Sequence, residues 1–181
     1  MAARGVHFAI SEEQRRELVI LSSDDDRIAY VQEILEEEWD ERFLLETDKA
    51  WDALHRCLSE YPPDTPWFYP MDPERGAFAL PEDQGARPLK LSVLGGKRLI
   101  TDESRYFIRL IEPDEVVELA SALNAVDGAG MRARYFRHCK GAWPEYGEDD
   151  FDYTWEYFLL LRDFFHRMPG NRRAVIFTAD Q

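Results

Sequence analysis

The chain is short of cysteine, of basic residues and of long apolar runs, and each shortage excludes a class of protein. Its two cysteines, Cys57 and Cys139, are too few for a disulfide framework and suit a reducing compartment. No apolar run approaches the roughly 20 residues of a membrane-spanning helix. The alternating pattern that begins at Val6 leaves no room for a signal peptide before it. We therefore expect a cytoplasmic protein with no membrane partner.

Basic residues are outnumbered by acidic ones, 22 against 36, which gives a formal net charge of −14. Nucleic acids and anionic membranes are bound through basic patches, so we expect neither as a direct partner. The excess is concentrated in residues 1–60, which hold 16 acids and 7 bases, with runs of three acids at 24–26 and 36–38. Such runs are either solvated helix faces or an acidic docking surface for a protein partner.

The apolar pattern predicts one α+β domain over residues 1–181, since 45% of the residues are hydrophobic and can fill a core. Alternation at 6–10 predicts a strand, and Ser11 begins a capping-box pattern that starts a helix at once. Ser22 or Ser23 would cap a second helix, whose apolar face includes Ile34, and Thr47 would cap a third over about residues 48–60.

Later segments complete a mixed, mostly antiparallel sheet with several packed helices. Residues 151–168 carry two apolar stripes at helical spacing, which predicts the best-buried helix of the domain. Gly95-Gly96 is typical of a hairpin turn, and Pro113 suits the first turn of a helix. The strands are expected near residues 6–10, 89–100, 105–111 and 173–179.

Residues 61–88 interrupt this pattern with seven prolines. Loops of this length in compact domains are usually functional or mobile. The segment also contains Trp67, Phe68 and Tyr69, which indicates that part of it packs against the domain. We expect a long irregular loop inside one domain, able to act as a lid over a pocket.

The segment from Asp48 to His55 is the strongest candidate for a site. On a helix, Asp48, Asp52 and His55 would share one face, with Trp51 beside His55 and Lys49 at the start. Two carboxylates and an imidazole could hold a metal, line a binding pocket or serve acid–base chemistry. The alternative is structural: Asp48 stabilises the helix start, Asp52 or a backbone carbonyl satisfies His55, and Trp51 is core. The sequence leaves both interpretations open.

Other motifs give no catalytic residue, no metal site and no cofactor. A zinc site from His55, Cys57, His138 and Cys139 has poor spacing, because residues two apart on a helix point in nearly opposite directions. The Gly95-Gly96-Lys97-Arg98 segment lacks the first glycine and the hydroxyl of a phosphate loop. Neither a serine nucleophile elbow nor a dinucleotide-binding glycine pattern is present.

Three short segments resemble the YfbM-like family of uncharacterised bacterial proteins. They are Asp48-Lys49-x-Trp51-Asp52-x-Leu54-His55, then Val93-Leu94-Gly95, and the closing Ala174-Val175. The resemblance spans nearly the whole chain, and its first block is the specific part. It implies a compact α+β domain in a bacterial cytoplasm and no established activity.

Three functions follow as hypotheses. The first is a protein-binding or regulatory module, including an immunity-type protein that neutralises a basic partner. The second is a small-molecule or metal-binding enzyme that uses Asp52 and His55. The third is an acidic mimic of nucleic acid. The identity of the partner and the oligomeric state do not follow from the sequence.

Overall fold

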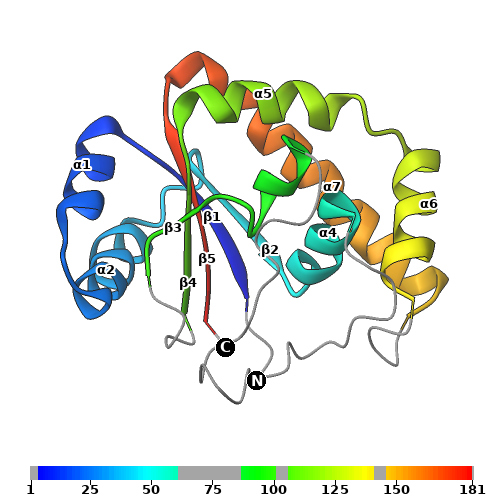
Figure 1. The fold of residues 1–181 in the computed structure, drawn as a ribbon, viewed down its shortest axis with the longest axis horizontal. Coiled ribbons are helices and arrows are strands. Elements are labelled where there is room, and N and C mark those ends of the chain that lie inside the picture. Colours follow the sequence, from blue (N-terminus) through cyan, green and yellow to red (C-terminus); the bar gives the residue numbers. More distant parts are fainter. Residues whose placement is uncertain (1–3, 61–86, 101–105, 141–145, 181) are drawn as a thin grey trace.

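A computed structural model describes residues 4–60, 87–100, 106–140 and 146–180. Its five strands form one sheet in the order β2-β1-β5-β4-β3, and all four pairings are antiparallel (Figure 1). The expected α+β fold is therefore confirmed, with a sheet that is antiparallel rather than mixed. The strands are β1 (Gly5–Ile10), β2 (Leu44–Asp48), β3 (Lys97–Arg98), β4 (Tyr106–Ile111) and β5 (Ala174–Asp180).

The sheet is covered by helices on both faces. Along β1, Val6, Phe8 and Ile10 join one buried apolar cluster, whereas Ala9 joins the other. Because alternate strand residues point to opposite faces, this division shows a three-layer arrangement. It also explains why β1 and β4 are buried at all six of their positions.

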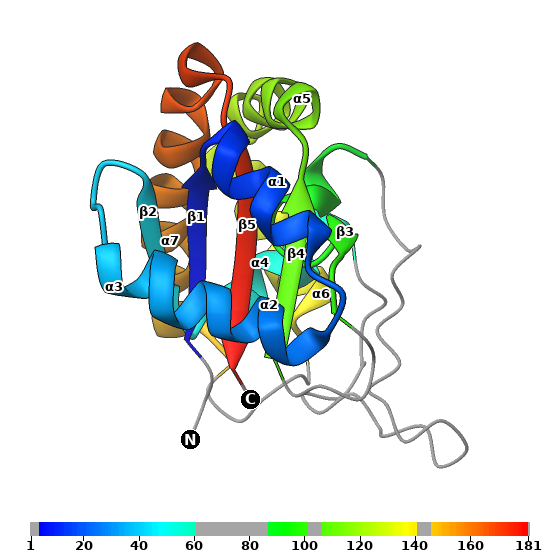
Figure 2. The same ribbon diagram turned by 90° about the vertical axis from the view of Figure 1, so that its left-hand side faces the viewer.

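One helical layer is built from an early stretch of the chain and lies across β1, β5 and β4 (Figure 2). Ser11 caps its first helix with the predicted capping box, and the Ser23 side chain accepts from the Asp26 backbone amide. Leu18, Val31 and Leu35 are its buried contacts with the sheet. The layer consists of α1 (Glu12–Ile20), α2 (Asp24–Tyr30), the π-helical turn η1 (Val31–Leu35) and α3 (Glu36–Glu38).

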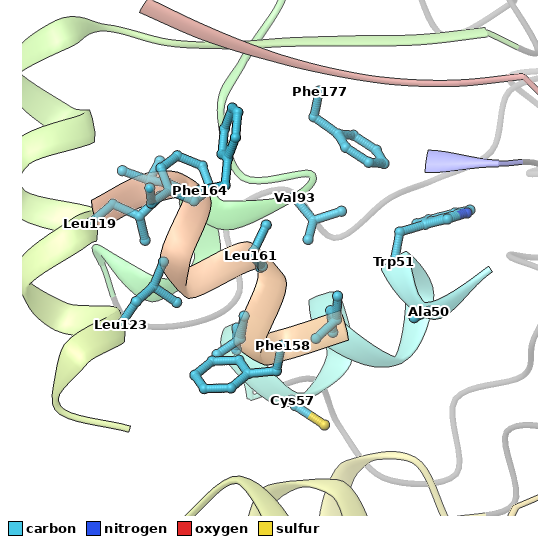
Figure 3. Packing of buried hydrophobic residues seen from close by; sticks show 14 of the residues in the cluster. Ala50, Trp51, Cys57, Val93, Leu119, Leu123, Phe158, Leu161, Phe164 and Phe177 are labelled. Atoms are coloured by element: carbon cyan, nitrogen blue, oxygen red, sulfur yellow. The ribbon is translucent and has the colours of Figure 1, made fainter. Parts of the chain in front are cut away.

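The opposite layer holds the larger core. Figure 3 shows Phe158, Leu161 and Phe164 on the same side of the sheet as Phe177 of β5 and Trp51. Its long helices are α4 (Ala50–Ser59), α5 (Pro113–Asn124), α6 (Gly128–His138) and α7 (Glu148–Arg167), with 3-10 turns η2 (Leu89–Ser92) and η3 (Pro169–Asn171).

The prediction that residues 151–168 form the best-buried helix is wrong. All ten residues of α4 are buried, because it lies among β2, η2, α6 and α7. In α7, Phe158 and Leu161 on one stripe are fully buried, but Trp155 on the same stripe is only partly buried and Leu160 on the second stripe is 51% exposed. A helix at the surface of a layer keeps one face in solvent, however aromatic its sequence.

Two further assignments differ from the sequence prediction. Most of the strand expected at 89–100 is absent, because residues 89–92 form η2 and the Gly95 amide closes a turn on the Lys90 carbonyl oxygen. Thr47 does not cap a helix: it ends up in β2, a strand that the sequence did not predict, and its hydroxyl donates to the Gly5 carbonyl. Of the predicted 61–88 loop, residues 61–86 lie outside the described residues.

Gly5 is a point of close approach between β1, β2 and α4. A Cβ placed there would lie 2.8 Å from Thr47 Oγ1, 2.8 Å from Trp51 Cβ and 2.9 Å from Phe177 Cε2. Contacts under 3 Å force neighbouring atoms to move. Thr47 Oγ1 and Trp51 Cβ are buried and lie close to their own backbone, so they have little freedom to do so. Glycine is therefore required here by space.

Replacing Gly5 with alanine is expected to lower the free energy of unfolding by about 1–3 kcal/mol, as for other overpacked cores. Urea denaturation gives this value directly. Gly170→Ala is the matched control, because a Cβ at Gly170 meets nothing within 4 Å and should leave stability almost unchanged. Equal stability of the two variants would contradict the close packing at Gly5.

Candidate functional site

Asp48 does not share a helix face with Asp52 and His55, which corrects the expected geometry. It ends β2 with a φ of 43°, and α4 begins only at Ala50, after Lys49 as the N-cap residue. The Tyr153 hydroxyl donates to the Asp48 carboxylate at 2.9 Å, and Arg4 lies 4.0 Å away. The Asp48 side chain thus joins the edge strand to α7, and Lys49 stays exposed.

Trp51 is a core residue. It is 6% exposed and packs against Phe107 at 6.2 Å and Phe177 at 5.8 Å between ring centroids. Figure 3 shows its ring extending from the start of α4 toward the Phe177 side of the core. This position agrees with the structural alternative for the Asp48–His55 segment, in which Trp51 belongs to the core.

Asp52 forms a buried ion pair one helical turn along α4. Its Oδ2 accepts from Nε of Arg56 at 2.8 Å, with side-chain exposures of 5% and 0%. Burial raises the pKa of Asp52, and the Arg56 charge and hydrogen bond oppose that shift. Burying both charges costs desolvation energy, so replacing only one partner of the ion pair would strongly lower the stability of the fold.

His55 is buried in a positively charged environment. Burial is the main cause that lowers its pKa to about 3, and the charges of Arg56, Arg109 and Lys90 lower it further. The imidazole is therefore neutral at neutral pH. A general base works best when its pKa lies near the working pH, so this environment is unfavourable for proton abstraction. The predicted pocket stays a prediction; its lining residues are Asp48, Lys49, Trp51, Asp52 and His55.

The two cysteines meet in the same core. Cys57 Sγ of α4 lies 3.7 Å from Sγ of Cys139, the C-cap residue of α6, and both are fully buried. Both are free thiols, and each is as buried as a small apolar residue of the core. Among residues 4–60, 87–100, 106–140 and 146–180, no three His, Cys, Asp or Glu side chains are grouped as a metal site would need.

A groove in the α1–α3 layer is a concave site among the described residues, and the sequence did not predict it. Its volume is about 400 Å³, within the range of ligand pockets. It lies where α1 and the α2–η1 helix meet the end of β1. Its lining combines apolar and charged side chains: Phe8, Ile10, Glu13, Gln14, Glu17, Tyr30, Ile34, Leu35, Glu38, Asp40, Arg42, Phe43 and Arg173.

The two basic residues of the groove are held by neighbours. The Arg173 guanidinium stacks on the Phe43 ring at 3.6 Å and donates to the Ala9 carbonyl at 3.0 Å. Arg42 makes a forked pair with Asp40, whose closest N–O distance is 2.7 Å. Partial burial is the main cause that lowers the pKa of Arg173.

Three carboxylates of the groove act on Tyr30. The Tyr30 hydroxyl donates to Glu17 at 2.8 Å, and Glu38 accepts from Gln14 at 3.4 Å. Partial burial first, then the Glu17 bond and the negative charges of Glu17, Glu38 and Glu13, raise the pKa of Tyr30 above its usual range. Three acids from α1 and α3 therefore lie close enough to the Tyr30 hydroxyl to act on it.

The π-helical turn shapes one wall of the groove. The Glu36 amide donates to the Val31 carbonyl five residues earlier, so this turn of the helix contains one extra residue. Val31 and Leu35 stay buried, but Ile34 is turned out and is 43% exposed in the groove. The sequence placed Ile34 on the buried face, which is wrong because regular helical spacing does not hold across the turn.

Comparison with known proteins gives a family and no activity. The family model described as domain of unknown function DUF1877 matches residues 1–178. The chain belongs to the DUF1877 family. This confirms the resemblance carried by the Asp48–His55 block. No curated protein matches the chain.

The DUF1877 fold is also found in a solved structure, that of a protein of unknown function, YfbM, from Escherichia coli. The TM-score is 0.63 at 17% identity, over 97% of this chain and 99% of that one. At this identity the likeness shows the fold alone. No helix in the described part of this DUF1877 chain combines the length and apolarity of a membrane span.

Proposed function

We propose that this protein is a cytoplasmic protein-binding module whose partner carries a basic surface. The observation that carries the proposal is the charge of residues 11–42, here called the acidic layer. This segment holds 12 acidic and 4 basic residues, a net −8 of the chain's −14. Most of it is helical, in α1, α2, η1 and α3, and these helices lie on one face of the sheet (Figure 2). An immunity-type protein is one form of such a module.

The few bases of the acidic layer are engaged within it. Arg15 and Arg16 both bind Glu12 at 2.9 Å, and Arg42 binds Asp40. By contrast, eight exposed acids of the layer form no ion pair within the described part of the chain: Glu13, Glu17, Asp25, Asp26, Glu33, Glu37, Glu38 and Glu41. The layer therefore presents a net negative field that attracts and orients a basic protein.

Exposed apolar side chains accompany this charge. Ile20 is 82% exposed, Ile34 43% and Trp39 40%, and all three lie on the acidic layer. Interfaces combine apolar or aromatic anchors with a charged rim, and the anchors supply most of the binding energy. Charge alone would suit solubility, whereas charge with exposed anchors supports a docking surface.

The test is capture of a partner from lysate at low salt by three forms of the full chain. Glu33→Lys with Glu37→Lys reverses two exposed charges on the acidic layer, and Glu118→Lys with Glu156→Lys makes the same charge change on α5 and α7. We expect the layer variant to lose about tenfold or more in affinity for the captured protein, because steering and rim contacts are lost.

The control variant should bind as the wild type does, and raised salt should release the partner from both. Equal binding by all three forms would contradict the proposal. Displacement of the partner by duplex DNA would assign the layer to the nucleic-acid mimics instead.

A further inference from the structure

The groove of the acidic layer has a floor and walls that suit an elongated side chain. Phe8, Ile10 and Leu35 provide apolar surface from the sheet and η1, and Ile34 adds an exposed apolar wall. Long cationic side chains bury their methylene stems on such surfaces and keep the charged group at a polar rim.

The rim of the groove carries the matching charge. Glu13, Glu17 and Glu38 line the groove together with Tyr30, whose hydroxyl donates to Glu17, whereas Arg42 is already paired with Asp40 and Arg173 already stacks on Phe43. Glu13 forms no hydrogen bond or ion pair within the described residues. A cation placed here gains charge-assisted hydrogen bonds to the carboxylates of the rim.

We propose that this groove receives a lysine or arginine side chain from a basic segment of the partner protein. The inference rests on the proposed function and deepens it, since it names the point where the partner is anchored. The acid surplus of the rim disfavours an anionic ligand, and the apolar walls match a methylene stem rather than a small hydrated ion. Glu13, Glu17, Glu38 and Tyr30 bind the charged end, and Ile34 packs against the stem.

The experiment uses the full chain and a fluorescein-labelled hexa-arginine peptide, with binding followed by fluorescence polarisation at low salt. Glu13→Gln with Glu38→Gln removes two charges from the groove. Asp25→Asn with Glu33→Gln removes two charges from the acidic layer outside the groove. All four side chains are at the surface or its edge, so circular dichroism should show the same melting for both variants.

We expect the groove variant to weaken peptide binding about tenfold and the outer variant by less than about threefold, because only the first removes direct contacts. Ile34→Ser, which leaves the charge unchanged, is expected to weaken binding about threefold without altering the salt dependence, because it removes apolar contact alone.

Two results separate the groove from the proposed function. Equal weakening by the two double variants, with no effect of Ile34→Ser, would overturn the groove and leave the acidic layer as a diffuse docking surface. No binding by the wild type, together with no charge-dependent partner in the capture experiment, would overturn both.

Discussion

Replacing Asp52 with alanine is expected to lower the free energy of unfolding by about 3–5 kcal/mol, among the largest effects of any single substitution in this chain. The reason is the depth of its partner. Arg56 has no solvent exposure, and the variant would leave its guanidinium in the core without the carboxylate at 2.8 Å. A loss of this size is a large fraction of the stability of an ordinary domain. Urea denaturation at pH 7 measures it.

A second variant separates the ion pair from simple loss of volume. Asp52→Leu with Arg56→Met replaces both charges with apolar groups, and it should recover a large part of the stability that Asp52→Ala loses. Glu156→Ala on the exposed side of α7 is the control, with a change within about 0.5 kcal/mol. A loss of less than about 1 kcal/mol for Asp52→Ala would show that the pair is not buried as described.

Acid is expected to destabilise the protein between pH 6.5 and 4 through His7. This side chain is fully buried, its Nε2 donates to the Ser92 carbonyl at 2.7 Å, and it contacts the rings of Phe164, Phe165 and Phe177. Burial lowers its pKa from 6.5 to about 4, against the smaller opposing effect of the Ser92 bond. Between these values the unfolded chain binds a proton that the folded protein does not.

Stability therefore falls as pH falls, by about 1.4 kcal/mol per pH unit for one such group, or about 3 kcal/mol across the window. His55, with its pKa of about 3, acts in the same direction, and the raised pKa of Asp52 acts in the opposite one. The contribution of His7 is isolated by comparing slopes rather than absolute stabilities.

His7→Gln should reduce the slope of unfolding free energy against pH by about 1.4 kcal/mol per unit between pH 4.5 and 6. Glutamine keeps an N–H donor for the Ser92 carbonyl but cannot bind the proton. The same substitution at His166, whose side chain is exposed at the end of α7, should leave the steep slope in place. An unchanged slope in His7→Gln would mean that His7 is protonated in the folded protein.

Local signals in the sequence were sufficient for several elements. The Ser11 capping box, the Ser23 cap and Pro113 at the start of α5 are each determined within one helical turn, and each is confirmed. The missed elements depend on distant partners. β2 carries Glu46 and Asp48 and is a strand because it pairs with β1, about 40 residues away. Residues 89–92 have strand-like composition, but the Gly95 turn folds them back on themselves.

The site was predictable only in part for the same reason. The Asp48–His55 block was recognised as special, and the contacts described here are structural: a strand-to-α7 bond at Asp48, a core ring at Trp51 and a buried ion pair at Asp52. The groove was not predicted, although Glu38 on its rim belongs to the acidic run at 36–38. It forms where the end of β1 lies beside Arg173, which precedes β5, and no local pattern joins positions more than 160 residues apart.

The adjacency of β1 and β5 has a consequence for how the chain folds. Gly5 faces Ala179 and Ile10 faces Ala174, so the centre of the sheet joins segments about 170 residues apart. Contacts between residues so far apart in sequence form slowly, because a long loop must close before any of them can stabilise the folded state. During synthesis, β1 and the acidic layer leave the ribosome before residues 174–180, so β1 cannot pair with β5 until those residues have been made. The high negative charge of that early segment then protects the waiting chain from self-association.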